Sequence, residues 1–130
     1  MRVLSTIRME SNGNLSPLHK KVEQMNPKEL MLYATAHCAA LTIKGILDKE
    51  HIHPKWMEIE ISGELDTEQI MAQSVYRSFN ILYRAECTHI EEHNKIAHAI
   101  RLTNEKYCGL LQMLRRIAPV SHEISIVSTE

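Results

Sequence analysis

Two cysteines stand in sequence contexts that could support redox chemistry. Cys38 lies inside the apolar stretch YATAHCAALTIK, and Cys108 lies in EKYCGLLQMLRRI, where a new helix is predicted to begin after Thr103 or Asn104. Two thiols that meet in one core can act as attacking and resolving partners in thiol–disulfide chemistry. Buried cysteines also serve as small apolar side chains, so packing is the alternative role for each of them.

The predicted place of Cys108 favours a thiolate. About one turn into a helix, unpaired backbone N–H groups and the helix dipole favour negative charge. Lys106 and the adjacent Arg115 and Arg116 could add positive potential. The third cysteine, Cys87, stands at the predicted end of a strand, outside both contexts, and is interpreted as a bystander.

Composition limits the classes of function. A length of 130 residues fits one domain, residues 1–130. Fifteen basic and 16 acidic residues give a net charge of −1. The chain therefore lacks the excess of basic residues that nucleic-acid binding requires. An odd number of widely spaced cysteines does not suit a secreted disulfide framework. With no apolar signal segment at the start, we expect a soluble cytoplasmic protein without a membrane partner.

The helix that must carry Cys38 has a well-marked start. In NPKE, Asn26 is the predicted N-cap, Pro27 occupies the first helical position, and Glu29 can complete a capping box. The helix then carries apolar residues on every face until HIHP, where Pro54 disfavours helical geometry. Since the rest of one chain can hardly cover every face, we expect this helix at the centre of a homodimer.

The remaining elements give an α+β layout. Residues 1–25 read as one or two short strands around the turn SNGN, and KWMEIEISGEL alternates as a strand that Gly63 breaks. Residues 74–86 form a second alternating strand, joined to the first by a hairpin. Helices are predicted over about 88–101 and from 104 or 105 to 117, and a last strand over 122–127. The fold class is therefore α+β, with helices packed on an antiparallel sheet.

One histidine-rich segment has an alternative interpretation as a zinc site. HIEEH, residues 89–93, matches the H-x-x-E-H pattern of inverted zinc proteases, in which two histidines share a helix face. Cys87 or His98 could supply a third ligand. The five-residue pattern is weak alone and the chain is small for such a protease, so we interpret the segment as an exposed polar face. No metal and no other cofactor is predicted.

Three other histidines have ordinary interpretations. His37 is next to Cys38, but neighbours in a helix point about 100° apart, so a packing or interface role is favoured over a base. His51 and His53 flank the end of the helix, where a cation interacts favourably with the dipole.

Both cysteine contexts resemble the motifs of one known family. SPLHKKVEQMNPKELMLYATAHCAALTIKGILDKE resembles the first Cys motif of the osmotically inducible protein C and organic hydroperoxide resistance (OsmC/Ohr) family, in which a Pro-initiated helix opens with Glu-Leu and carries an Ala-rich turn before its Cys. IAHAIRLTNEKYCGLLQMLRRIAPVSHEISIV is similar to the second motif, where Ala-Ile-x-Leu-Ser-x-x-Tyr-Cys leads into a short helix and a last strand. The likeness covers roughly residues 24–127.

The resemblance implies an OsmC-like fold, an intertwined homodimer with its sites at the subunit interface, and a thiol-dependent peroxidase acting on organic hydroperoxides. Cys38 would be the peroxidatic residue and Cys108 the resolving one, and a thiol reductant would reopen their disulfide. In the family a Glu ten residues before the first Cys pairs with an Arg from the N-terminal strands. This chain has Lys28 there and Glu29 next to it, which makes Glu29 the third candidate catalytic residue.

That departure keeps a second function open. Neither Arg2 nor Arg8 aligns convincingly with the family's arginine. The alternative is a non-peroxidatic OsmC-like protein that binds a small apolar ligand at the dimer interface.

Overall fold

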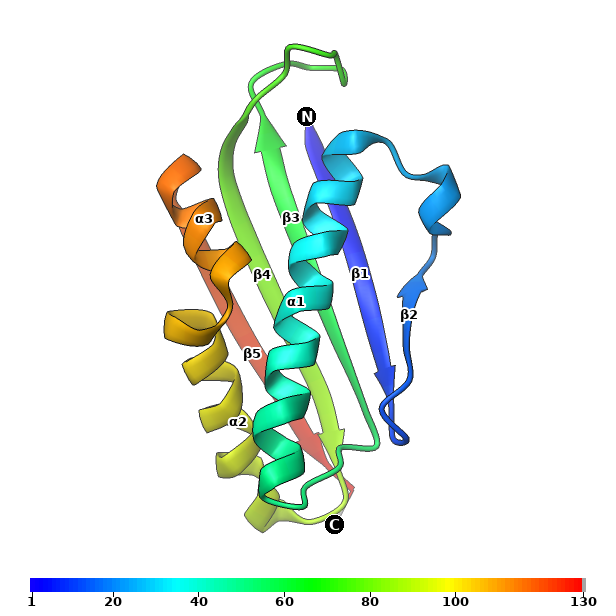
Figure 1. Ribbon diagram of the computed structural model, residues 1–130, viewed down its shortest axis with the longest axis vertical. Coiled ribbons are helices and arrows are strands. Elements are labelled where there is room, and N and C mark those ends of the chain that lie inside the picture. Colours follow the sequence, from blue (N-terminus) through cyan, green and yellow to red (C-terminus); the bar gives the residue numbers. More distant parts are fainter. Residues whose placement is uncertain (130) are drawn as a thin grey trace.

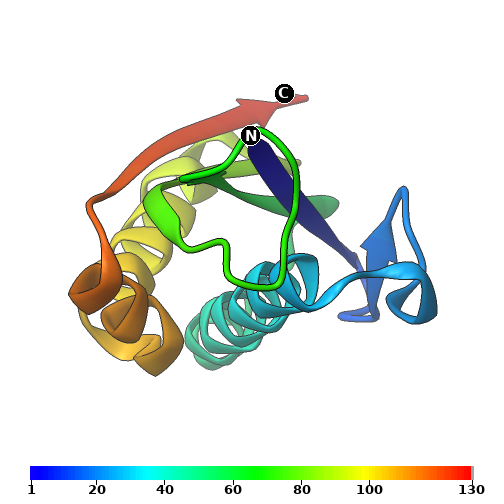
Figure 2. The same cartoon turned by 90° about the horizontal axis from the view of Figure 1, so that it is seen from above.

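The computed structural model describes residues 1–129 and places a five-stranded sheet behind a layer of helices (Figure 1). Seen from above, the three α-helices all lie on the same side of the sheet (Figure 2). The elements in chain order are β1 (Arg2–Glu10), β2 (Leu15–Leu18), η1 (Val22–Gln24), α1 (Pro27–Lys49), β3 (Trp56–Leu65), β4 (Tyr76–Cys87), η2 (Ile90–Glu92), α2 (His93–Leu102), η3 (Thr103–Tyr107), α3 (Gly109–Ile117) and β5 (Val120–Ser128).

The sheet is mixed, which corrects one expectation. Its order is β2-β1-β3-β4-β5, and all neighbours run antiparallel except β5, which runs parallel to β4. The prediction of a wholly antiparallel sheet is therefore wrong at its last strand. Between β4 and β5 the chain passes through two helices, and such a helical crossover returns it to the end where β4 began.

The alternation of β3 and β4 is confirmed. Met57, Ile59 and Ile61 are buried on the face that meets the helices. Gly63 does not break β3, contrary to expectation, because the strand continues to Leu65. A Cβ atom at Gly63 would lie 2.5 Å from the Tyr76 ring, so glycine serves there for close packing and not as a strand end.

The helix α1 begins as predicted. Asn26 Oδ1 accepts a hydrogen bond from the Glu29 N–H at 3.0 Å, and Glu29 Oε1 accepts one from the Asn26 N–H at 3.1 Å. One face is buried against the sheet, while Leu30, Met31 and Leu41 remain exposed on the other. By length and composition α1 could also cross a membrane, a test that the core helix of a soluble protein passes too.

The helical region before β5 is divided differently from the prediction. The segment Thr103–Tyr107 is a π-helix that continues α2, and the Cys108 N–H donates to the Thr103 carbonyl at 3.2 Å. Cys108 itself has extended backbone angles, φ −94° and ψ 107°, and is the N-cap of α3. The expected place of Cys108, one turn inside a helix, is therefore wrong: the helix begins one residue after it.

Candidate active site

The structure brings Cys38 and Cys108 together. The Cys108 thiol donates a hydrogen bond to Cys38 Sγ, with the two sulfur atoms 3.1 Å apart. Cys38 comes from the middle of α1 and is partly buried, whereas Cys108 comes from the start of α3 and is fully buried. Both are free thiols. Seventy positions of sequence separate them, so only the packing of α3 on α1 creates the pair.

Burial dominates the electrostatics of Cys108. The pKa of Cys108 is raised to about 12; desolvation by burial is the largest cause, and the S–H bond donated to Cys38 is the second. The backbone N–H groups of Leu111 and Leu110 act in the opposite direction, as expected for an N-cap residue. The expectation that Cys108 ionises readily is thus reversed, and Cys108 is the proton donor of the pair at neutral pH.

A buried polar network adjoins the segment that leads to Cys108. The Tyr83 hydroxyl donates to Asn104 Oδ1 at 2.8 Å, and both residues are buried. Gln112 Nε2 donates to the Asn104 carbonyl at 3.4 Å, and Arg115 Nη1 donates to Gln112 Oε1 at 2.9 Å. Sequence reasoning missed this network. The available signal was a tyrosine on the buried face of a strand, since a buried phenol usually finds a hydrogen-bond partner.

Glu29 is not brought to the thiols. It precedes Cys38 by nine residues, which at 1.5 Å per residue corresponds to about 13 Å along α1. Its carboxylate completes the N-terminal capping box and accepts from Lys20 Nζ at 2.8 Å. The neighbouring Lys28 directs its ammonium to the Ala72 carbonyl at 3.4 Å.

The N-terminal arginines are engaged elsewhere. Arg8 pairs with Glu58 at 2.7 Å and with Glu10 at 2.6 Å, and Arg2 lies 3.6 Å from Glu60. The charge of each arginine is therefore balanced by glutamate and not by a cysteine thiolate. The structure therefore does not join these arginines to Glu29 in the relay that the resemblance implied.

The HIEEH segment does not have the helical geometry of a zinc-protease motif. Its middle forms the short 3-10 turn η2, and α2 begins only at His93, so His89 and His93 do not share one helix face. His93 Nε2 lies 3.2 Å from the Ile126 carbonyl oxygen. Within residues 1–129 no group of three or more His, Cys, Asp or Glu side chains is placed to hold a metal ion.

The other candidate residues lie outside the thiol pair. Cys87 Sγ lies 3.4 Å from the His89 carbonyl oxygen and 3.6 Å from that of Val127. His37 packs its ring 6.2 Å from the ring of Tyr33, one turn earlier in α1. Neither contact involves Cys108.

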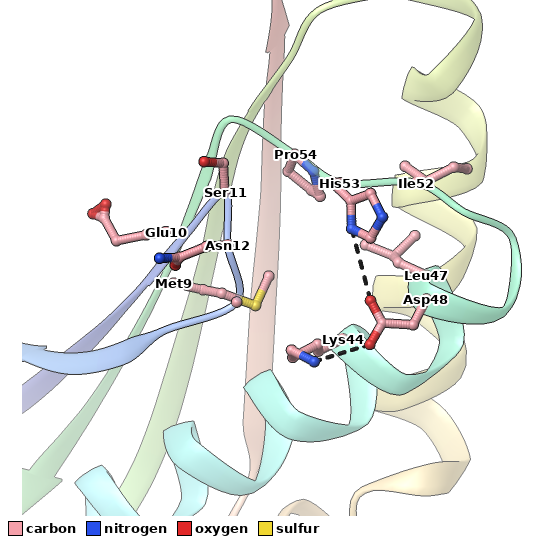
Figure 3. A pocket seen from close by; sticks show the side chains of 11 residues that line it. Met9, Glu10, Ser11, Asn12, Lys44, Leu47, Asp48, Ile52, His53 and Pro54 are labelled. Carbon is pink, nitrogen blue, oxygen red and sulfur yellow. Dashed lines mark hydrogen bonds and ion pairs between the residues drawn. The ribbon is translucent and has the colours of Figure 1, made fainter.

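A pocket of about 400 Å³ lies between the β1–β2 turn and the C-terminal end of α1 (Figure 3). Asp48, on its rim, pairs with Lys44 at 2.9 Å and lies 3.8 Å from His53. Neither Cys38 nor Cys108 is among its lining residues. Asp48 follows Cys38 by ten residues, about 15 Å along the helix, so this pocket is separate from the thiols.

Comparisons with known proteins agree with this fold. The family model described as OsmC-like protein matches residues 19–123. The protein YhfA of Escherichia coli K12 is 24% identical over 103 residues, which are 79% of this chain and 74% of that protein. The crystal structure of an OsmC-like protein from Mycoplasma pneumoniae superposes with a TM-score of 0.63 at 11% identity, covering 98% of this chain and 97% of that one.

A further structural match is a protein whose name states a function. The organic hydroperoxide resistance protein OhrB of Bacillus subtilis superposes with a TM-score of 0.53 at 14% identity, over 95% of this chain and 97% of that one. At such identities the structural matches establish the fold. The family match spans most of the chain, and the protein therefore belongs to the OsmC-like family, some of whose structural neighbours are hydroperoxide resistance proteins.

Proposed function

We propose that this protein is a thiol-dependent peroxidase that reduces organic hydroperoxides. The observation that carries the proposal is the 3.1 Å approach of Cys108 Sγ to Cys38 Sγ, with Cys108 as the hydrogen-bond donor. In this proposal the two thiols have different roles, which the direction of the hydrogen bond supports: Cys38 is the nucleophile, and Cys108 holds a proton beside it.

The first step consumes the peroxide. The Cys38 sulfur attacks the distal peroxide oxygen, the O–O bond breaks, and an alcohol leaves with a proton. Cys38 is oxidised to a sulfenic acid and the peroxide is reduced. Cys38 is the more accessible of the two thiols, because it is partly exposed while Cys108 is fully buried.

The second step closes the disulfide. Cys108 displaces the hydroxyl group from the Cys38 sulfenic acid, so a disulfide forms and water leaves. A sulfur–sulfur bond is about 2.05 Å long, so the two sulfurs need to approach by only about 1 Å from their separation in the reduced protein. A dithiol reductant then supplies two electrons and two protons and restores both thiols.

The working unit in this proposal is a homodimer in the cytoplasm. Leu30, Met31 and Leu41 leave an apolar stripe exposed on α1, and Met113 and Ile117 do the same on α3. A second copy that covers these side chains would bury them and would enclose the space beside Cys38 in an apolar wall. Such a wall suits the hydrocarbon part of an organic hydroperoxide.

One observation supports a different function. Glu29 is held at the helix cap by Asn26 and Lys20, and Lys28 occupies the position of the family's glutamate. A site without that carboxylate fits a protein that binds a small apolar molecule at the dimer interface without reducing peroxides. The reactivity of Cys38 separates the two functions.

The test is a stopped-flow measurement with cumene hydroperoxide and a dihydrolipoyl reductant. Wild-type protein should consume peroxide catalytically, and peptide mapping after one equivalent of peroxide should find a Cys38–Cys108 disulfide. Cys38→Ser should abolish consumption, because the nucleophile is lost.

Cys87→Ser is the matched control, since Cys87 is a buried cysteine outside the pair. It should consume peroxide at the wild-type rate. Equal rates for wild type and Cys38→Ser in folded protein would refute the peroxidase and favour the ligand-binding alternative.

A further inference from the structure

The segment that precedes Cys108 is an unusual piece of helix. Residues Thr103–Tyr107 adopt π-helical turns between α2 and α3, and the chain then becomes extended at Cys108. π-Helical turns are rare and occur often at functional sites. The place where this segment ends decides where the Cys108 sulfur lies, because Cys108 is the first residue after it.

The π-helical segment is tied to the sheet by one buried side-chain hydrogen bond. The Tyr83 hydroxyl, from the centre of β4, donates to Asn104 Oδ1 at 2.8 Å. Tyr83 has no exposed surface and Asn104 is 2% exposed, so neither group has ready access to water. Gln112 holds the backbone of the same residue from the α3 side, through the Asn104 carbonyl.

We infer that the Tyr83–Asn104 hydrogen bond positions the Cys108 thiol beside Cys38, so that Tyr83 and Asn104 are positioning residues for disulfide formation. This inference rests on the proposed function, in which Cys108 is the resolving thiol. Removing the phenol hydroxyl leaves Asn104 Oδ1 buried without its donor, and a buried polar atom without a partner is costly. The segment can relieve that cost by moving toward water, and Cys108 then moves away from Cys38.

The electrostatics agree with this arrangement. Burial is the largest cause that raises the pKa of Tyr83, and a negative charge on Cys108 is the second. Tyr83 therefore remains a protonated donor throughout the redox cycle, and its hydroxyl lies within electrostatic range of the Cys108 sulfur. It can hold Asn104 whether Cys108 is a thiol or part of a disulfide.

The experiment is a glutathione equilibrium, which needs no peroxide. The reduced protein and oxidised glutathione exchange to give the Cys38–Cys108 disulfide and two reduced glutathiones, and the equilibrium constant measures the effective concentration of one thiol at the other. Tyr83→Phe should lower this constant by about tenfold relative to wild type, the equivalent of one lost hydrogen bond. A general loss of stability does not change this constant unless it separates the two thiols.

Tyr76→Phe is the matched control. Tyr76, the first residue of β4, is a second tyrosine donor on this strand: its hydroxyl donates to the Lys28 carbonyl at 2.7 Å. Its loss should leave the constant unchanged. Gln112→Met, a milder change at a partly exposed site, cuts the α3 tie to Asn104 and should lower the constant by about twofold.

The outcomes separate this inference from the peroxidase. If wild type forms the disulfide and reduces peroxide, but Tyr83→Phe and Gln112→Met both have the wild-type constant, the positioning role is refuted and the peroxidase stands. If wild type forms the disulfide in glutathione but consumes no peroxide, the peroxidase is refuted while the positioning role is decided by the same variants. If wild type forms no Cys38–Cys108 disulfide, both are overturned.

Discussion

The N-terminal cap of α1 and the middle of the same helix differ in how they use polar groups. At the cap, Glu29 binds Asn26 and Lys20, which precede it by three and nine residues. In the middle of the helix, Cys38 meets Cys108 over 70 positions, in a region that buries Cys108 completely. The first group of contacts is local and partly hydrated, and the second is long-range and includes a fully buried thiol.

In the proposed function, chemistry and stability are separated along the helix. A partly hydrated ion pair such as Lys20–Glu29 contributes little, about 0.5 kcal/mol. A buried thiol, in contrast, has its protonation set by desolvation. On this proposal we expect the cap to serve folding and the middle of the helix to serve reactivity.

The largest expected effect tests the middle of α1. Cys108→Ser should permit one turnover and then stop, because the Cys38 sulfenic acid has no resolving thiol. Dimedone labelling followed by mass spectrometry should locate the sulfenic acid on Cys38. Sustained turnover at the wild-type rate would mean that Cys108 is a packing residue, and Cys87→Ser provides the control for removing a buried thiol.

The next effect tests the exposed side of the same helix. Leu41, at the exposed middle of α1, is 50% exposed and should lie in the proposed dimer interface. Leu41→Glu should weaken dimerisation by about 100-fold, because two-fold symmetry buries the new charge twice. Analytical ultracentrifugation measures this change.

Ile90→Glu is the control for the dimer prediction, since Ile90 is 63% exposed and belongs to the short turn η2, not to α1 or α3. It should leave the dimer intact. A wild-type protein that sediments as a folded monomer at micromolar concentration would contradict the proposed assembly.

A smaller effect concerns the contrast between the buried Cys108 thiol and the partly hydrated cap. Burial raises the pKa of Cys108 to about 12 from an ordinary value of 9.0. Between these values the unfolded chain has lost the proton while the folded chain retains it, so the unfolded state is favoured as pH rises. The free energy of unfolding should therefore fall by about 1 kcal/mol between pH 8 and 10 in wild type relative to Cys108→Ser.

Urea denaturation of reduced protein at each pH measures this difference, with Cys108→Ser correcting for every other group that titrates. Parallel stability curves for the two proteins would show that Cys108 ionises as easily in the folded state as in the unfolded one. That result would remove the distinction between the cap and the middle of the helix.

The smallest effect tests the cap. Glu29→Gln retains a capping side chain but removes the charge that faces Lys20. We expect a loss of stability of about 0.5 kcal/mol and an unchanged rate of peroxide consumption. If the rate falls as far as in Cys38→Ser, Glu29 belongs to the catalytic machinery, as the family pattern implies.

Features that depend on neighbours along the chain could be predicted from the amino-acid sequence alone. The N-cap at Asn26, the alternation in Trp56–Leu65 and the turn between β1 and β2 are set by local backbone preferences and by the period of apolar residues. The family resemblance also rests on local motifs, which is why the sequence alone was enough to select the two cysteines.

Features that join distant segments depended on the tertiary fold. The parallel pairing of β5, the place of Cys108 outside α3 and the bond from Tyr83 to Asn104 are each set by how a crossover packs against the sheet. The protonation of Cys108 was predicted in the wrong direction for the same reason. A helix start favours a thiolate wherever it occurs, but desolvation is set by the segments packed around it, and here burial outweighs the helix amides.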